Sequence, residues 1–309
     1  MSEQFVQSMS AMNTVITIHV VGSGATATQR AERAARVARA MDWFTQVERT
    51  CSRFDATSEL RQLSMHVGVP VTVSPMLFHA LHFALAVARE TDGAFDPTIG
   101  RQMESLGFNR SHRDDSRVVS PFDNAPVSFR DVTLDAEQQT VCLARPVAFD
   151  LGAVAKGLAI DLAARELEAF AHVAIDAGGD QYFCGHNAYD EPWSVGIRHP
   201  REHDRTITTL RVTDRAVCTS GDYERVVLPH TTNGAVNHHL RDARTGETAA
   251  ALASVTVLAP TAMVADALAT AAFALGPDDG RALLAHHGVD ALLITPALDC
   301  LTVGKLPYA

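Results

Sequence analysis

The sequence has few cysteines, and none of them is arranged to staple a fold or bind a metal. The five cysteines are odd in number, scattered, and never form a CxxC pair. This excludes a disulfide framework and a zinc ribbon, and it favours a reducing compartment with the thiols in the core. Two adjacent histidine pairs, His238–His239 and His286–His287, have no HExxH or Cys/His ligand spacing around them. A zinc site at either pair is therefore a minor alternative.

Basic runs and long apolar runs are also missing. Lys and Arg number 26 against 36 Asp and Glu, which gives a formal net charge of −10 without a basic cluster. This argues against nucleic acid or an anionic membrane as the main partner. No stretch approaches the roughly twenty apolar residues of a membrane-spanning helix. The N-terminal segment carries Glu3 and a strand-like apolar run rather than a signal core, so we expect a cytoplasmic protein.

The composition is that of a globular protein with a large core. Hydrophobic residues make up 47% of the 309 residues and charged residues 20%. No linker, repeat or low-complexity segment divides the chain. We therefore expect one large domain of two lobes over residues 1–309.

Local patterns predict a mixture of strands and helices. β-Branched residues predict a strand at 14–21, and helical periodicity follows at 27–47. Ser74 followed by Pro75 is a start signal for a helix at 74–90. Further helices are predicted at 150–170, 261–275 and 278–287, with Gly276 and Pro277 as a stop. Further strands are predicted at 132–135, 140–144, 172–180, 253–259 and 290–295, and strand and turn signals dominate 193–227. The sum is an α+β (mixed α/β) architecture.

Asp266 and Thr270 stand four residues apart in an otherwise apolar helical segment, so both side chains share one face. A carboxylate among Ala, Leu, Met and Phe is costly to bury unless a positive charge meets it. Asp with a hydroxyl and a backbone carbonyl suits a hard cation such as Mg²⁺. The pair therefore predicts a Mg²⁺ site or a basic partner, and the alternative is a solvated Asp on the outer face of an ordinary helix.

Three glycine-containing clusters could let a ligand approach the backbone. Residues 150–157 (DLGAVAKG) place small residues and Lys156 between a strand and a helix, which favours phosphate. Residues 176–180 (DAGGD) carry paired glycines after a strand, and residues 219–223 (TSGDY) offer hydroxyls that could hold an anion. Each cluster could equally be an ordinary turn.

Polar and aromatic residues gather in three further segments. Residues 238–246 (HHLRDARTG) combine imidazole, guanidinium and carboxylate groups, which suit a base near neutral pH and a phosphate ligand. An exposed polar hairpin would look similar. The loops at 52–60 (SRFDATSEL) and 93–100 (GAFDPTIG) are aromatic and acidic, and their chemistry alone names no ligand.

Taken in order, these segments resemble the successive motifs of the ApbE-like FAD:protein FMN transferases. The motifs are SRFDxxSEL, GAFDPTIG, DLGAVAKG, DAGGD, TSGDYER, HLRDARTG and SVTVLAPTAMVADALATA, and the similarity runs from about Met12 to the C-terminus. Seven ordered motifs are far more specific than any one of them. The resemblance implies an ApbE-like fold and a transferase that moves FMN from FAD onto a Ser or Thr hydroxyl of an acceptor protein, releasing AMP.

The resemblance also implies roles for individual residues. Mg²⁺ would be held by the Ala153 carbonyl, Asp266 and Thr270, and FAD is the substrate. His239 and Lys156 are the catalytic candidates, with His239 as the base or as an aid to charge transfer at the pyrophosphate. The implied FAD contacts are Met12, Phe54, Ala94, Phe95, Asp96, Asp150, Lys156, Asp180, Ser220, Gly221 and Arg241. Lys156 and a divalent cation suit a pyrophosphate cleavage, which builds negative charge on oxygen.

The sequence departs from the family pattern at several places. Met12-Asn13-Thr14 stands where Met-Gly-Thr is common, Arg241 replaces an aliphatic residue, and Ala243 replaces Pro. These changes could alter backbone approach, flavin contacts or the choice of acceptor. The secretion and lipidation signal of many members is missing, so a periplasmic location cannot be carried over.

A tetrapeptide and two other activities complete the interpretation. Residues 23–26 (SGAT) resemble the Ser/Thr-Gly-Ala-Thr acceptor motif, which makes Thr26 a hypothetical internal acceptor, although Ser-Gly is also an ordinary turn into a helix.

The alternative activities are a Mg²⁺-dependent FAD pyrophosphatase with water as nucleophile and a non-catalytic flavin carrier. Dependence on an acceptor separates the transferase from the pyrophosphatase.

Overall fold

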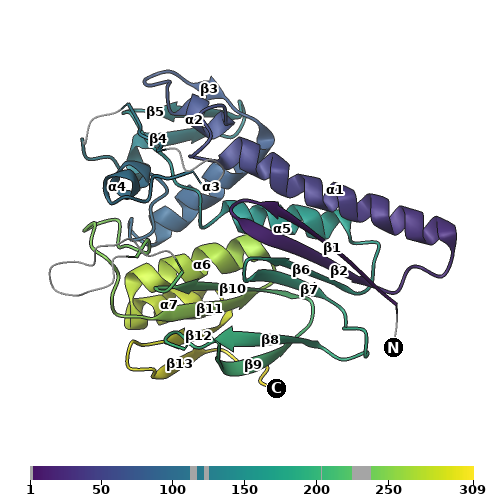
Figure 1. Ribbon diagram of the computed structural model, residues 1–309. Coiled ribbons are helices and arrows are strands. Elements are labelled where there is room, and N and C mark those ends of the chain that lie inside the picture. The colour runs from purple at the N-terminus through teal and green to yellow at the C-terminus, as the bar shows by residue number, and fades with distance from the viewer. Residues whose placement is uncertain (1–2, 112–116, 122–124, 203, 225–237) are drawn as a thin grey trace.

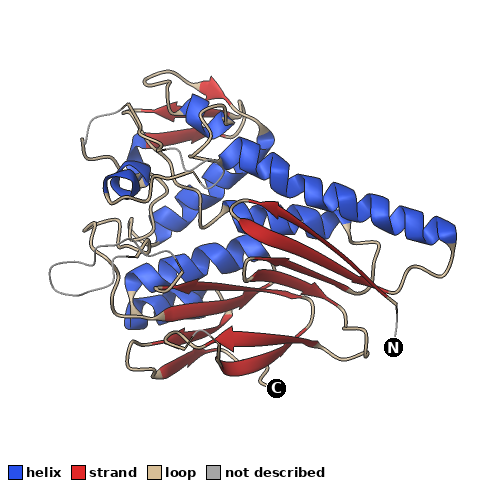
Figure 2. Ribbon diagram, in the orientation of Figure 1, coloured by secondary structure: helices blue, strands red, loops and turns tan. Residues whose placement is uncertain are grey.

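A computed structural model describes residues 3–111, 117–121, 125–202, 204–224 and 238–309 of the chain. Helices and antiparallel sheets both contribute, which confirms the α+β prediction (Figures 1 and 2). None of the helices in the described part of the chain combines the length and apolar character that crossing a membrane requires.

An eight-stranded antiparallel sheet forms the largest layer. Its order is β1 (Gln4–Ala11), β2 (Thr14–Val21), β6 (Val173–Ala177), β7 (Asp180–Cys184), β10 (Arg215–Gly221), β11 (Ser254–Ala259), β12 (Asp290–Ile294) and β13 (Cys300–Val303). All six residues of β11 are buried, because both faces of the sheet are covered and a strand in that position needs apolar side chains on both sides.

Helices cover one face and a two-stranded ribbon covers the other (Figure 2). The helices are α1 (Ala27–Cys51), α3 (Pro75–Glu90), α5 (Ala155–Glu166), α6 (Ala262–Leu275) and α7 (Pro277–His286). The ribbon pairs β8 (Trp193–Arg198) with β9 (Thr206–Val212). Alternate residues of β8 are buried and exposed, as expected for a strand with one covered face.

A smaller lobe lies at the end of the helical layer (Figure 1). It contains the three-stranded sheet β3 (Val71–Thr72), β5 (Thr140–Leu143) and β4 (Val132–Asp135), with α2 (Glu59–Leu63), α4 (Gly100–Ser105) and the 3₁₀ turn η1 (Phe129–Asp131). One continuous cluster of buried side chains contains residues of both sheets. One domain of two lobes stays a prediction, and the continuous core favours it.

Several predicted boundaries differ from the structure. The strand at 14–21 and the helix start at Ser74–Pro75 are confirmed, and the Ser74 hydroxyl accepts the Leu77 N–H at 3.2 Å. The helix predicted at 150–170 spans only α5, because residues 150–154 form a turn in which Asp150 accepts the Gly152 N–H. Pro277 begins α7 instead of ending α6, since a helix N-terminus needs no N–H there.

Smaller differences concern element lengths. The helix predicted at 27–47 continues to Cys51, and the strand predicted at 172–180 divides into β6, a turn and the start of β7. The strand and turn signals predicted over 193–227 correspond to β8, β9 and β10, of which β10 ends at Gly221, and residues 225–227 lie outside the described part of the chain. The chain also opens with the hairpin β1–β2, whereas the sequence predicted one strand followed by a helix.

Two tight hairpin turns lie side by side at one end of the large sheet. Met12 and Asn13 join β1 to β2 with φ of 50° and 63°, and Gly178 and Gly179 join β6 to β7 with φ of 70° and 95°. Because Ile16 pairs with Ala177, the two turns are neighbours. Two-residue hairpins favour such left-handed residues, and Asn adopts them more readily than most other non-glycine residues. Asn13 therefore preserves the left-handed turn at the position where glycine is common.

Candidate functional site

The predicted site residues converge on one cavity of about 920 Å³. It lies where the hairpin turns, the N-terminus of α5, α6 and the loops of the smaller lobe meet. The predicted residues that line it are Met12, Phe54, Ala94, Phe95, Asp96, Asp150, Ala153, Lys156, Ser220, Gly221, His239, Arg241, Asp266 and Thr270. Asp180 alone of the predicted set does not line it. Residues distant in the sequence thus share a single site, as the motif order predicts.

Asp266 and Thr270 project from α6 into this cavity. Only 6% of Asp266 is exposed, because α6 packs against α5, α7, β10 and β11. The alternative of a solvated Asp on an outer helix face is therefore wrong. The Thr270 hydroxyl lies 3.0 Å from the Ser220 hydroxyl at the end of β10. Two hydroxyls thus meet at the junction of α6 and β10, and the Asp266 carboxylate lines the same cavity one helical turn away.

The donors at this junction fit Mg²⁺. Asp266 supplies a carboxylate and Thr270 a hydroxyl, and Ala153 lines the same cavity from the loop before α5. Within the described residues, no group of three or more His, Cys, Asp and Glu side chains could hold a metal ion. Mg²⁺ does not require such a group, because it commonly takes one or two carboxylates and completes its shell with water and phosphate oxygens.

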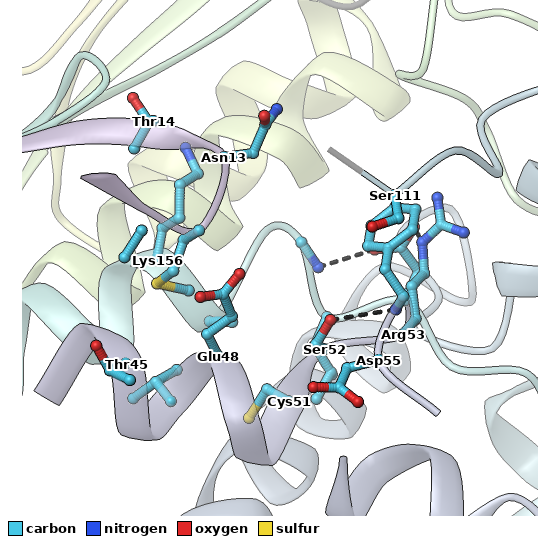
Figure 3. A pocket seen from close by; sticks show the side chains of 18 of the residues that line it. Asn13, Thr14, Thr45, Glu48, Cys51, Ser52, Arg53, Asp55, Ser111 and Lys156 are labelled. Atoms are coloured by element: carbon cyan, nitrogen blue, oxygen red, sulfur yellow. Dashed lines mark hydrogen bonds and ion pairs between the residues drawn. The ribbon is translucent and has the colours of Figure 1, made fainter. Parts of the chain in front are cut away.

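Lys156 lies in the first turn of α5 and forms an ion pair with Asp180 (Figure 3 shows Lys156). Asp180 is the first residue of β7 and is 3% exposed. The Asp180 carboxylate does not line the cavity itself. It orients the Lys156 ammonium group, which does. A lysine at a helix N-terminus adds a full charge to the partial positive charge of the helix end, so this corner of the cavity favours an anion.

Arg53 is a site residue that the sequence did not identify. Its Nε lies 2.9 Å from the Asp150 carboxylate, and its guanidinium carbon lies 4.1 Å from the centre of the Phe54 ring. The other Asp150 oxygen accepts the Gly152 N–H at 2.9 Å. Arg53 thereby holds both Phe54 and the loop before α5. The motif SRFD contains this arginine, but only the fold reveals its partner.

Asp96 is held mainly by the protein itself. One carboxylate oxygen accepts the Thr98 N–H and hydroxyl at 2.8 and 2.7 Å, and the other accepts the Phe129 N–H at 2.9 Å. Burial raises the pKa of Asp96, although these hydrogen bonds favour its charged form. The side chain therefore fixes the loop that carries Ala94 and Phe95, and little of its hydrogen-bonding capacity remains for a ligand.

The segment around Arg241 is tied to the same loop. The Arg241 side chain donates to the Gly246 carbonyl at 2.9 Å, and burial lowers its pKa because the guanidinium has left water. The Ala243 N–H donates to the Ala94 carbonyl at 3.1 Å. Proline has no N–H, so the Ala243 departure creates a hydrogen bond that the common family residue could not make.

The adjacent histidines have different surroundings. His238 is 3% exposed, its ring meets Phe273 edge to face, and burial lowers its pKa. His239 lines the cavity and contacts the Phe108 ring edge to face, with the centroids 6.4 Å apart. His238 is thus a core residue, and His239 is the imidazole that lines the cavity.

A second cavity of about 960 Å³ adjoins the first (Figure 3). The two share Met12, Phe54, Asp150 and Lys156, and the second extends along the last turns of α1 past Glu48 and Cys51. On the side of β8, the first cavity is bordered by Arg198, which pairs with Glu224 at 3.2 Å and lies over the Tyr223 ring. The sequence analysis assigned no role to these three residues, although Tyr223 and Glu224 belong to the motif TSGDYER.

Thr26 lies away from the cavity, at the opposite end of β2. Its hydroxyl accepts the Gln29 N–H at 3.2 Å and the Gln29 side chain accepts the Thr26 N–H, which forms a capping box at the start of α1. The interpretation of residues 23–26 as a turn into a helix is confirmed. The cavity lies at the Thr14 end of β2 and Thr26 follows the Val21 end. Because β2 spans about 25 Å, Thr26 does not reach the cavity of its own chain.

Comparisons with known proteins agree with this geometry. The model of the ApbE family matches residues 12–293. The FAD:protein FMN transferase of Treponema pallidum is 35% identical over 77% of this chain and 71% of its own length. The crystal structure of the ApbE protein of Thermotoga maritima superimposes with a TM-score of 0.81 at 28% identity, covering 97% of each chain. The flavin transferase ApbE of Vibrio cholerae gives a TM-score of 0.81 at 25% identity, covering 100% of this chain and 97% of its own.

Proposed function

Because the chain belongs to the ApbE family, we propose that it transfers FMN from FAD to a Ser or Thr hydroxyl of an acceptor protein and releases AMP. A related protein that is 35% identical carries the name FAD:protein FMN transferase. The observation that carries the proposal is the convergence of Lys156, His239, Asp266 and Thr270 on one cavity. These side chains supply the cation, the base and the oxygen donors that pyrophosphate chemistry requires.

In the proposed reaction, the acceptor oxygen forms a bond to the phosphorus of the FMN half of FAD. The bond from that phosphorus to the bridging oxygen breaks, and AMP leaves with that oxygen. His239 takes the proton of the attacking hydroxyl, since imidazole exchanges protons near neutral pH. Lys156, oriented by Asp180, stabilises the negative charge that develops on the phosphate oxygens.

We infer that the reaction depends on Mg²⁺. The carboxylate of Asp266, the hydroxyl of Thr270 and the carbonyl of Ala153 would hold the ion. When bound, it would neutralise charge on the pyrophosphate as a Lewis acid. The low exposure of Asp266 supports this assignment, because a buried carboxylate is stabilised by a nearby cation.

The residues around the Arg53–Asp150 pair and the Ala94–Asp96 loop are proposed to bind FAD. Phe54 offers an aromatic face for a flavin or adenine ring. The Arg53 guanidinium lies over the Phe54 ring and fixes the orientation of that ring. Ala94 and Phe95 line the cavity from a loop that Asp96 holds in place. Ser220 and Gly221 at the end of β10 lie beside Thr270 and would contact the phosphates.

AMP release from FAD tests the proposal. The assay compares Mg²⁺ with EDTA, with and without an acceptor fragment that carries a Ser-Gly-Ala-Thr segment. AMP that forms only with metal and acceptor, together with a flavin adduct on the fragment, is the expected result. AMP without acceptor would establish a pyrophosphatase instead, and FAD bound without cleavage would establish a carrier. Intact mass of the enzyme after incubation with FAD and Mg²⁺ checks Thr26, for which we expect no adduct.

A further inference from the structure

Asp161 joins the two helices that carry the proposed catalytic and metal-binding residues. It lies on α5, just over one turn after Lys156. Its two carboxylate oxygens accept the N–H groups of Ala262 and Met263, at 2.7 and 3.0 Å. These are the first two residues of α6, whose own N-cap residue, Thr261, makes no side-chain capping bond. Asp161 thus caps α6 from a neighbouring helix.

The contact around this cap is unusually close. A Cβ atom added to Gly157 would lie 2.4 Å from the Met263 Cα and 2.6 Å from the Ala262 carbonyl oxygen. The backbones of α5 and α6 therefore touch at Gly157, with Lys156 before the contact and the Asp161 cap after it. Two constraints, one steric and one by hydrogen bonds, fix α6 along and around its axis relative to α5.

The residues placed by this contact are those of the proposed metal site. Asp266 lies one turn beyond the capped residues and Thr270 one turn further, both lining the cavity with Lys156. A change in the start of α6 would therefore move both oxygens relative to the ammonium group. Displacements near 1 Å are enough to reduce catalysis strongly.

On this geometry we propose that Asp161 is a positioning residue, which holds α6 so that Asp266 and Thr270 face Lys156 at the correct distance for a metal-bound pyrophosphate. The inference rests on the proposed function. Burial raises the pKa of Asp161 to about 6 even though the two N–H groups favour the charged form. The ionised cap is thus kept at a cost in stability, which agrees with a role in placing the site.

Binding of Mn²⁺, used as an EPR-visible substitute for Mg²⁺, tests the inference directly. Asp161→Asn keeps the shape of the side chain but turns one acceptor into a donor facing the N–H groups of α6. We expect Mn²⁺ affinity to fall at least tenfold and kcat for AMP release to fall with it, while the KM for FAD changes less. Hydrogen exchange at Ala262 and Met263 should become faster. Asp161→Glu keeps the charge but shifts it by one methylene, and an intermediate loss is expected.

Ser74→Ala is the matched control, because Ser74 caps α3, which carries none of the proposed site residues. It should lower the unfolding temperature and leave Mn²⁺ affinity unchanged. Equal losses of Mn²⁺ affinity in the Ser74 and Asp161 variants would reduce Asp161 to a general stabilising residue. Wild-type affinity in both Asp161 variants would overturn the inference alone, whereas absence of Mn²⁺ binding by the wild type would overturn the proposed metal site and the inference together.

Discussion

The cavity is built from two sets of residues that the chain holds in different ways. The helix-borne set, Lys156, Asp266 and Thr270, stands on α5 and α6, which pack into the core. The loop-borne set, Phe54, Ala94–Asp96 and Arg241, stands on loops fixed by ion pairs and hydrogen bonds such as Arg53–Asp150. Rigid elements place charge precisely, whereas loops present varied surface to a ligand. We expect changes in the first set to affect the chemical step and changes in the second to affect substrate binding.

The largest effect is expected for Asp266→Ala. Loss of the only acidic side chain proposed to hold the metal should lower turnover at limiting Mg²⁺ by about a hundredfold or more. The fold should survive, because the new side chain suits the buried surroundings of α6. AMP release across a Mg²⁺ titration, with circular dichroism of the same sample, makes the measurement. Asp290→Asn, which alters a carboxylate paired with Arg215 away from the cavity, is the control; unchanged turnover in the Asp266 variant would refute the metal assignment.

Arg53→Met should affect the loop-borne set. It leaves the partly buried Asp150 carboxylate without its ion-pair partner, and breaking such a pair costs about 3 kcal/mol. Phe54 also loses the guanidinium over its ring. We expect weaker FAD binding with a smaller change in kcat, measured by FAD titration, steady-state kinetics and urea unfolding. The FAD affinity of Arg53→Lys should lie between those of the wild type and Arg53→Met. A loss confined to kcat would contradict the assignment of substrate binding to the loop-borne set.

The pH dependence of stability should reveal Asp161, which joins the two helices of the helix-borne set. Its pKa is raised to about 6 by burial, so the folded protein holds this proton more tightly than the unfolded chain. The stabilising contribution is therefore full below about pH 4 and is lost as pH rises through about 6. Relative to Asp161→Asn, the wild type should lose about 2 to 3 kcal/mol between pH 4 and 7. Urea unfolding of both proteins across this range makes the measurement, and a constant difference would contradict it.

The smallest effect is expected for Ala243→Pro. The change removes the hydrogen bond from the Ala243 N–H to the Ala94 carbonyl, worth about 1 kcal/mol. The KM for FAD should therefore rise by about fivefold with kcat nearly unchanged. Ala243→Gly retains the N–H and should behave like the wild type in KM. If proline has no effect on FAD binding, the contact between the two loops does not shape the FAD site.

Local chemistry made much of the fold readable from the sequence. Ser74–Pro75 predicts the start of a helix, and the spacing of Asp266 and Thr270 predicts that both lie on one helical face. Both signals depend only on residues within a turn or two of each other. The strand at 14–21 was equally clear from its β-branched residues. Boundaries that depend on distant partners were less accurate, as at residues 150–154, where an Asp150 turn precedes α5.

The candidate site was predictable as a set of residues, but its internal contacts were not. The seven ordered motifs contain every predicted residue that lines the cavity except Met12. The pairs Arg53–Asp150 and Lys156–Asp180, however, join separate motifs. Local pattern alone does not separate His238 from His239, since adjacent residues have nearly identical patterns, and only the family resemblance pointed to His239. In the structure, His238 packs against Phe273, whereas His239 lines the cavity beside Phe108.

The sequence by itself determined the family, the α+β class and the residue types of the site, because motif order and local periodicity survive without coordinates. The tertiary structure alone decided which carboxylates are occupied by protein partners, that His238 packs in the core, and that Asp161 caps α6. The physical reason is that burial and pairing depend on which segments become neighbours, and that arrangement is set by packing of the whole core rather than by any short stretch of the chain.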